Sequence, residues 1–111
     1  MAISIVVSDT VGIKVKGTLV DSAGITQPFD FRLTCTRLDS DQISAKLKND
    51  PESSITDFLI DVVQDWSGVR DADGKPVPYS ESALQQLCKL QGVAMLALRA
   101  YLSDVGAKEK N

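Results

Sequence analysis

Hydrophobic and polar positions alternate through the first third of the chain, and this pattern predicts β-structure there. A short alternating run at Ile3–Val7 indicates a half-buried strand. Residues 12–21 and 26–37 each place apolar side chains on one face and polar ones on the other, and residues 21–24, Asp-Ser-Ala-Gly, supply a turn between them. We therefore expect a long β-hairpin. Its apolar face needs a cover, because an isolated two-stranded ribbon is only marginally stable in water.

Helical periodicity follows the hairpin. The segment Ile55–Trp66 repeats its large apolar side chains at spacings of three and four, which predicts a helix with one buried face. Ser54, followed three residues later by Asp57, is a variant of the capping box and places the start of this helix near Ser54. Gly68 supplies a stop at the far end.

Three further helices are expected around this one. Residues 39–49 predict a short, mostly exposed helix that is capped by Asp39 or Ser40. Ser80 is interpreted as the N-cap of the next helix. The run 93–102 is apolar almost all the way round, which is typical of a helix with neighbours on several sides.

Together these patterns predict an α+β fold in a single domain that spans residues 1–111. An N-terminal antiparallel β-hairpin of two to three strands, residues 1–38, is expected to pack against a C-terminal cluster of about four α-helices, residues 39–106. We expect the charged tail, residues 107–111, to fray.

The composition agrees with one globular domain and argues against nucleic acid and membranes as partners. The chain has 111 residues, of which 43% are apolar and 24% are charged, with a net charge of -3. This acidic balance argues against nucleic acid as a partner, because such a protein needs a basic face. No apolar run approaches the roughly 18 residues that span a bilayer, and the first residues lack the basic flank of a signal peptide. We therefore expect a cytoplasmic protein with no membrane partner.

The sequence offers little for catalysis. It contains no histidine, the commonest general base and metal ligand. Cys35 and Cys88 lie far apart, each on an apolar face, and are interpreted as reduced, buried thiols in preference to a disulfide or a reactive thiol. The aspartates are interpreted as helix caps and solvated faces. We therefore expect no enzyme, no catalytic residue and no cofactor.

A calcium site at Asp71–Gly74 (Asp-Ala-Asp-Gly) is considered and set aside. With Gly74 at the sixth position of an EF-hand loop, the first ligand position falls on Val69 and the twelfth on Ser80, and neither residue supplies the carboxylate that calcium needs there. The pattern favours a plain β-turn at Asp73-Gly74, and no metal is expected.

The motifs between Trp66 and the end of the chain occur in a characteristic order. A hairpin and a helix lead to Trp66–Val69 (Trp-Ser-Gly-Val), then to the Asp-Gly turn and Pro-Tyr-Ser helix start of Asp71–Ser80, then to a leucine-bearing helix and Ala97–Tyr101 (Ala-Leu-Arg-Ala-Tyr). The chain closes with Ala107–Asn111 (Ala-Lys-Glu-Lys-Asn). This arrangement resembles the tail assembly chaperones of long-tailed bacteriophages, most clearly from residue 58 onward. In that family a Trp-x-Gly-Val before an Asp-Gly turn, a Pro-aromatic-Ser helix start and a short Lys-Asn-like ending recur.

The resemblance implies a non-enzymatic protein that binds the tape-measure protein, a long helical chain that sets tail length. Such proteins keep the tape measure soluble in the cytoplasm of the bacterial host until tail-tube subunits replace them, and they are absent from the mature virion. We place self-association into a homo-oligomer on the hairpin around Val20 and Arg32, since strand edges can pair with another chain. We place the tape measure in a groove near Trp66, Val69 and Tyr79.

Other interpretations of these residues stay open. Trp66 completes an apolar stripe and Tyr79 fits a hydrophobic staple, so both are favoured as structural anchors even where they also face a partner. One alternative function is a phage structural protein retained in the virion, such as a head-tail connector or a minor tail component. Another is a small enzyme using a carboxylate pair, which requires two acids that converge in one pocket.

Overall fold

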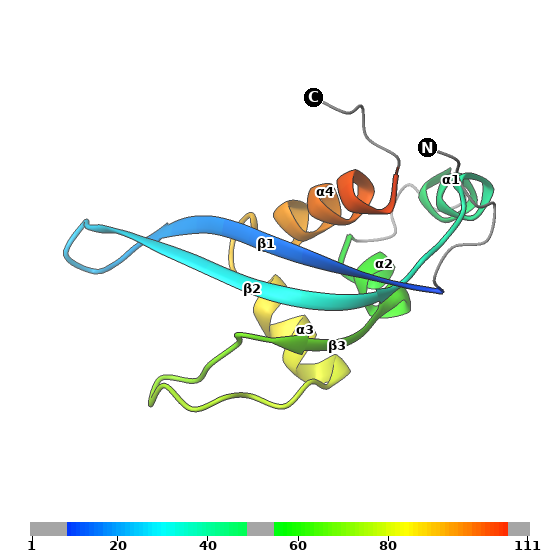
Figure 1. Ribbon diagram of the computed structural model, residues 1–111. Coiled ribbons are helices and arrows are strands. Elements are labelled where there is room, and N and C mark those ends of the chain that lie inside the picture. The colour runs from blue at the N-terminus through cyan, green and yellow to red at the C-terminus, as the bar shows by residue number, and fades with distance from the viewer. Residues whose placement is uncertain (1–8, 49–54, 107–111) are drawn as a thin grey trace, which may run out of the picture.

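The computed structural model describes residues 9–48 and 55–106, which form a three-stranded antiparallel sheet and four helices (Figure 1). The strands follow the order β1-β2-β3 across the sheet. Their bounds, and those of the helices, are β1 (Thr10–Val20), β2 (Thr26–Thr36), α1 (Ser40–Lys48), α2 (Ile55–Val62), β3 (Val63–Ser67), α3 (Glu81–Cys88) and α4 (Val93–Val105). The predicted α+β class, with a hairpin followed by about four helices, is confirmed.

The β1–β2 hairpin forms where the alternating pattern predicts it. Ile13 pairs with Leu33, and both side chains are almost fully buried. The next pair, Lys14 and Arg32, points to the opposite face and is exposed. The sheet therefore has one face that packs on the helices and one face in contact with solvent.

The hairpin reverses at Asp21, whose carboxylate organises the turn. Asp21 Oδ1 accepts hydrogen bonds from the backbone N–H groups of Ala23 at 2.9 Å and Ile25 at 3.0 Å. Gly24 adopts a φ of +79°, a conformation that glycine reaches without a Cβ penalty. The hydrogen bonds from Ile25 and then from Gln27 lower the pKa of the Asp21 carboxyl.

Strand β3 occupies residues that the sequence predicts to be helical. Helix α2 ends at Val62, and the chain then pairs with the edge of β2, with Val63 opposite Cys35 and Trp66 opposite Leu33. The register shifts by one residue at Gln64, which forms a β-bulge. The bulge brings Val63 and Trp66 to the same buried face although they lie three positions apart. The prediction of a helix as far as Trp66 is therefore wrong in its second half.

Some predicted features lie outside the described residues. These are the strand at Ile3–Val7, the helix start at Ser54 and the tail of residues 107–111. Within residues 9–48 and 55–106, the third strand of the sheet is β3.

Polar caps set two of the helix starts. Asp39 Oδ1 accepts a hydrogen bond from Gln42 N at 2.8 Å, and Gln42 Oε1 accepts one from Asp39 N at 2.9 Å. This reciprocal pair is a capping box at the start of α1. Ser80 Oγ accepts a hydrogen bond from Ala83 N at 3.0 Å at the start of α3. Both predicted caps are confirmed.

Helix α4 lies against β1 and α2 and supplies the centre of the core, as its apolar sequence predicts. Tyr101 is fully buried, and its hydroxyl donates to Thr36 O at 2.8 Å and accepts from Leu38 N at 3.1 Å. Its ring meets Phe58 edge-on, with centroids 5.7 Å apart. The side chain thereby joins α4 to the end of β2 and to α2. Arg37 adds a second link, because its guanidinium donates to Val105 O at 3.0 Å.

Candidate partner-binding surfaces

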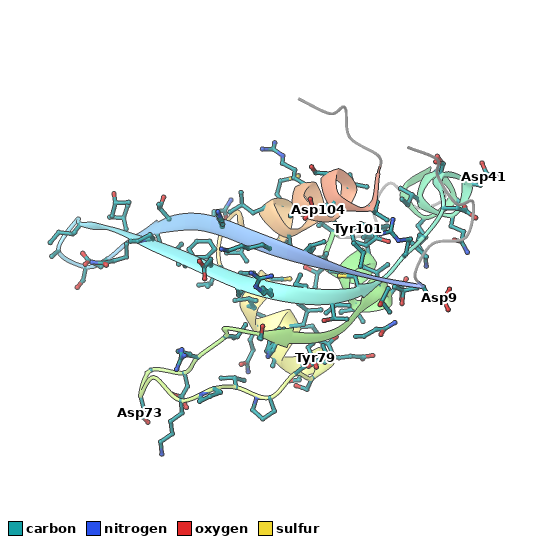
Figure 2. The ribbon with its side chains drawn as sticks, viewed as in Figure 1. Asp9, Asp41, Asp73, Tyr79, Tyr101 and Asp104 are labelled. Atoms are coloured by element: carbon teal, nitrogen blue, oxygen red, sulfur yellow. The ribbon has the colours of Figure 1, made fainter. Side chains whose placement is uncertain are left out.

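The segment between β3 and α3 makes a second, smaller reversal, with Asp73 at its tip in Figure 2. Asp71 Oδ1 accepts hydrogen bonds from Asp73 N at 2.9 Å and Lys75 N at 3.0 Å, and Asp71 O accepts one from Gly74 N at 3.0 Å. Asp21 holds the β1–β2 turn with the same set of hydrogen bonds. The predicted turn at Asp73-Gly74 is confirmed, and Asp71 is the residue that holds it.

The chain returns from this turn alongside β3. Val77 N donates to Val69 O at 2.9 Å, and the indole Nε1 of Trp66 donates to Val77 O at 2.7 Å. The ring of Tyr79 meets Trp66 edge-on at 5.2 Å, and its hydroxyl donates to Val63 O at 3.2 Å. Burial raises the pKa of the Tyr79 hydroxyl. The two aromatic residues therefore anchor the returning chain to the sheet.

A groove of about 540 Å³ runs along this reversal, and we call it the loop groove. Trp66 is buried at its base, whereas Val69 and Tyr79 are half-buried. The structure therefore brings together the three residues that the sequence proposes for tape-measure binding. The groove is lined by Asp65, Trp66, Ser67, Gly68, Val69, Arg70, Pro76, Val77, Pro78 and Tyr79.

The two hairpin residues proposed for self-association lie apart. Val20 and Arg32 share the solvent-exposed face of the sheet, but Arg32 pairs with Lys14, six positions before Val20 on β1. At the rise of an antiparallel strand this is a separation of about 20 Å. Val20 lies beside the turn with 68% of its surface exposed, and Arg32 lies over the middle of the sheet. They do not form one compact patch.

The end of the hairpin extends beyond the helices, as Figure 1 shows. We call residues 18–28 the hairpin arm, and all of them are exposed. At its base lies a second groove, the arm groove, with a volume of about 150 Å³. Its walls come from Leu19 of the arm, from residues 29–31 of β2, from residues 68–70, and from the end of α3, the α3–α4 connection and the start of α4. It is lined by Leu19, Phe29, Asp30, Phe31, Gly68, Val69, Arg70, Leu87, Leu90 and Val93.

The sequence did not predict the arm groove. Its residues come from segments far apart in the chain, and no local pattern joins them. The only available signal is the group of aliphatic residues beside the first turn, Leu19, Val20 and Ile25, since turns are normally polar.

Acidic side chains are spread over the molecule. Figure 2 labels Asp9, Asp41, Asp73 and Asp104 at well-separated places. Among the described residues, no three of the types His, Cys, Asp and Glu lie close enough together to hold a metal ion. In the same part of the chain, no helix combines the length and the apolar character needed to cross a bilayer.

Both cysteines are free thiols. Cys35 is fully buried on β2, and burial raises its pKa to about 12. Cys88 is half-buried at the end of α3, and burial raises its pKa as well. The interpretation as a reduced, buried thiol is confirmed for Cys35, and Cys88 is partly accessible.

These features define a small α+β protein whose distinctive surfaces are two grooves on either side of Val69 and Arg70. The family model of the YdaY prophage protein matches residues 35–104, which is more than half of the chain. The chain therefore belongs to this family, and the expectation of a phage-derived protein is confirmed at that level. The match includes β3, helices α1 to α3, α4 except for its last residue, and the loop groove, but not the hairpin arm. No curated protein and no solved structure matches the chain.

Proposed function

We propose that this prophage protein is a tail assembly chaperone that binds a helical segment of the tape-measure protein. One observation carries the proposal. Within the motifs behind the resemblance, residues 66–69 and 76–79 line a single groove, the loop groove, and the turn at residues 71–75 connects them. Trp66 and Tyr79 anchor the returning chain to the sheet, and the same arrangement leaves the half-buried Val69, Val77 and Tyr79 along the groove, where a partner can contact them.

The loop groove is suited to the apolar stripe of an amphipathic helix. Helix-in-groove recognition uses side chains spaced three and four residues apart, which enter a row of apolar sites. Val69, Val77 and Tyr79 are half-buried and offer such a row. The bonds from Trp66 to Val77 and from Tyr79 to Val63 hold the walls in place before binding. Less conformational entropy is then lost when the partner enters.

A small binder of this kind supports solubility by covering exposed apolar surface. A long helical chain with an uncovered apolar stripe is an aggregation hazard, because large exposed apolar patches associate with one another. Several copies on one tape measure would raise one another's effective concentration, so each contact can be weak. The protein would act without catalysis, in the host cytoplasm, and would leave when tail-tube subunits take its place.

A co-purification experiment tests the proposal. The tape-measure protein of the same prophage is expressed with this chain, and we expect the two to co-purify and the tape measure to stay in the soluble fraction. Val77→Asp places an unpaired charge at a half-buried position that lines the loop groove but not the arm groove, and it should weaken binding at least tenfold, about 1.4 kcal/mol. Ile43→Asp, at a similarly half-buried apolar position on α1, is the matched control and should bind normally. Failure of the wild-type chain to retain the tape measure would contradict the proposal.

The alternative of a structural protein is tested separately. Particles purified after prophage induction are analysed by mass spectrometry. We expect this chain to be absent from the particles and present in the cell lysate. Its presence in stoichiometric amounts in the particles would favour a head-tail connector or a minor tail component instead.

A further inference from the structure

The hairpin arm is exposed and almost uncharged, and three aliphatic side chains, Leu19, Val20 and Ile25, are exposed on it. Val20 and Ile25 have 68% and 58% of their surface exposed. The arm carries one charge, Asp21, in a chain in which 24% of residues are charged. That carboxylate is already hydrogen-bonded within the turn and to Gln27 Nε2 at 3.0 Å. Natural proteins usually protect exposed strands with charged residues, and the arm has no such protection beyond its turn.

The arm groove offers a space that matches the arm. A volume of about 150 Å³ among Leu and Phe side chains is of the size that holds a benzene ring in other proteins. One branched aliphatic side chain therefore fits. Leu90 at the rim has 44% of its surface exposed, so the groove is open to a side chain that arrives from outside.

The tip of the arm cannot reach the arm groove of its own chain, although Leu19, near the base of the arm, lines that groove. Ile25 lies at the tip of the arm, and the groove lies at its base. The β1–β2 ladder runs without a break from Thr10 and Thr36 to Val20 and Thr26, so the arm cannot fold back on itself. The tip of the arm and the arm groove can therefore meet only between different molecules.

We propose that two copies of this chain pair about a twofold axis, each placing Ile25 in the arm groove of the other. Such a contact is isologous, because the same patch serves on both copies and the assembly closes as a dimer. It differs from the sequence-based prediction of a patch around Val20 and Arg32, since it uses the inner face and the tip of the arm. Residues 68–70 line both grooves, so the pairing is tested on the chain alone, without a partner in the loop groove.

Asp30 and Arg70 are the charged residues that line the arm groove, and Asp30 is paired with Lys14 Nζ at 3.7 Å, so Arg70 is the charge that favours this pairing. Asp21 lies beside Ile25, with Asp21 N donating to Ile25 O at 3.0 Å. Arg70 lines the arm groove and uses one of its five N–H donors on Gly74 O at 3.0 Å. Seating Ile25 in the groove therefore brings an acidic group of one copy toward a basic group of the other. The arm and groove together present about twenty residues per copy, at the lower end of what stable interfaces use.

Sedimentation velocity of the full chain alone, over a roughly hundredfold range of concentration, tests the pairing. We expect a reversible monomer–dimer equilibrium. Ile25→Asp and Leu90→Asp should each raise the dissociation constant at least tenfold, because each leaves a carboxylate in the apolar contact. Leu102→Asp, at a position 38% exposed on the far end of α4, is the matched control and should dimerise like the wild type. A chain that stays monomeric, or a dimer that Ile25→Asp does not weaken, would overturn the proposal.

Disulfide trapping tests the geometry. In a Cys88→Ser background, with Cys35 buried, Ile25→Cys and Leu90→Cys are introduced into separate chains. A covalent dimer should form when the two variants are mixed and oxidised, but not from either variant alone. Both substitutions in one chain should give a closed dimer. A ladder of longer oligomers, or trapping through Ile25→Cys alone, would overturn the twofold arrangement. No tape measure is present, so this outcome is independent of the proposed function.

Discussion

Tyr101 shows how one side chain can connect distant segments of this small chain. Its hydroxyl bonds to Thr36 O and to Leu38 N, groups that are more than sixty positions away in the sequence. A buried hydroxyl with both a donor and an acceptor role is expensive to remove, because its backbone partners are left unsatisfied.

Tyr101→Phe should therefore lower the free energy of unfolding by about 1–3 kcal/mol. Tyr79→Phe is the matched control, since it removes one hydrogen bond of 3.2 Å from a half-buried ring. Urea denaturation of the two variants should give a clearly larger loss for Tyr101→Phe. Equal losses would show that the bonds to Thr36 and Leu38 contribute little.

Cys35 predicts a dependence of stability on alkaline pH. The unfolded thiol loses its proton near a pKa of 9.0, whereas burial raises the pKa in the folded protein to about 12. Between these values the folded state holds one proton more than the unfolded state, so the free energy of unfolding falls as pH rises. The slope for one thiol is up to about 1.4 kcal/mol per pH unit.

Urea denaturation between about pH 8 and pH 10 measures this slope. Cys35→Ala should flatten it, although burial also raises the pKa of Tyr79 and Tyr101, which keep part of the dependence in the same direction. An unchanged slope in Cys35→Ala would show that the thiol does not titrate on unfolding.

At the scale of elements, the local sequence pattern predicts the secondary structure correctly where no tertiary contact favours a different conformation. The hairpin follows from strict alternation, and the caps at Asp39 and Ser80 need only a few consecutive residues. The prediction of a helix after Val62 is wrong because a spacing of three positions places Val63 and Trp66 on the same face in a helix and also in a strand with a bulge. Pairing with the edge of β2 favours the strand over the helix, and the sequence pattern of this segment alone does not reveal that an unpaired edge lies beside it.

Gly68 ends β3 where the chain passes close to β2. Its φ is +85°, and a Cβ at this position would lie 3.3 Å from Phe31 Cα. Gly74, with a φ of +79°, has open space around it. Gly68→Ala should cost about 1–3 kcal/mol of unfolding free energy and more than Gly74→Ala, which meets only the backbone penalty of about 1–2 kcal/mol. Thermal unfolding of both variants measures the difference, and a larger cost at Gly74 would contradict the close approach at Phe31.

At the scale of the whole molecule, sheet and helices share one core, to which β1, β2, α2, β3, α3 and α4 all contribute. We therefore predict that the chain unfolds as a single cooperative unit. Trp66, the only tryptophan, reports on β3 by fluorescence, and far-UV circular dichroism reports mainly on the helices. The two urea transitions should coincide. Separate midpoints would show that the sheet and the helical cluster are independent.

The candidate surfaces were predictable only in part. Trp66, Val69 and Tyr79 belong to one stretch of sequence, so a shared groove could be anticipated from the turn between them. The arm groove needs Leu19, Leu90 and Val69 to converge from three segments. That convergence depends on tertiary packing, which periodicity does not encode.

The bonds of Tyr101 to Thr36 and Leu38 also bear on how the protein is made. The hairpin leaves the ribosome before α4 exists, and about 65 residues separate Thr36 from the side chain that secures it. At translation rates of roughly 5–20 residues per second, the apolar face of the nascent hairpin stays exposed to solvent for roughly 3–13 seconds before α4 has been synthesised. The protein that we propose prevents aggregation of another polypeptide is therefore itself prone to aggregation while it is being translated.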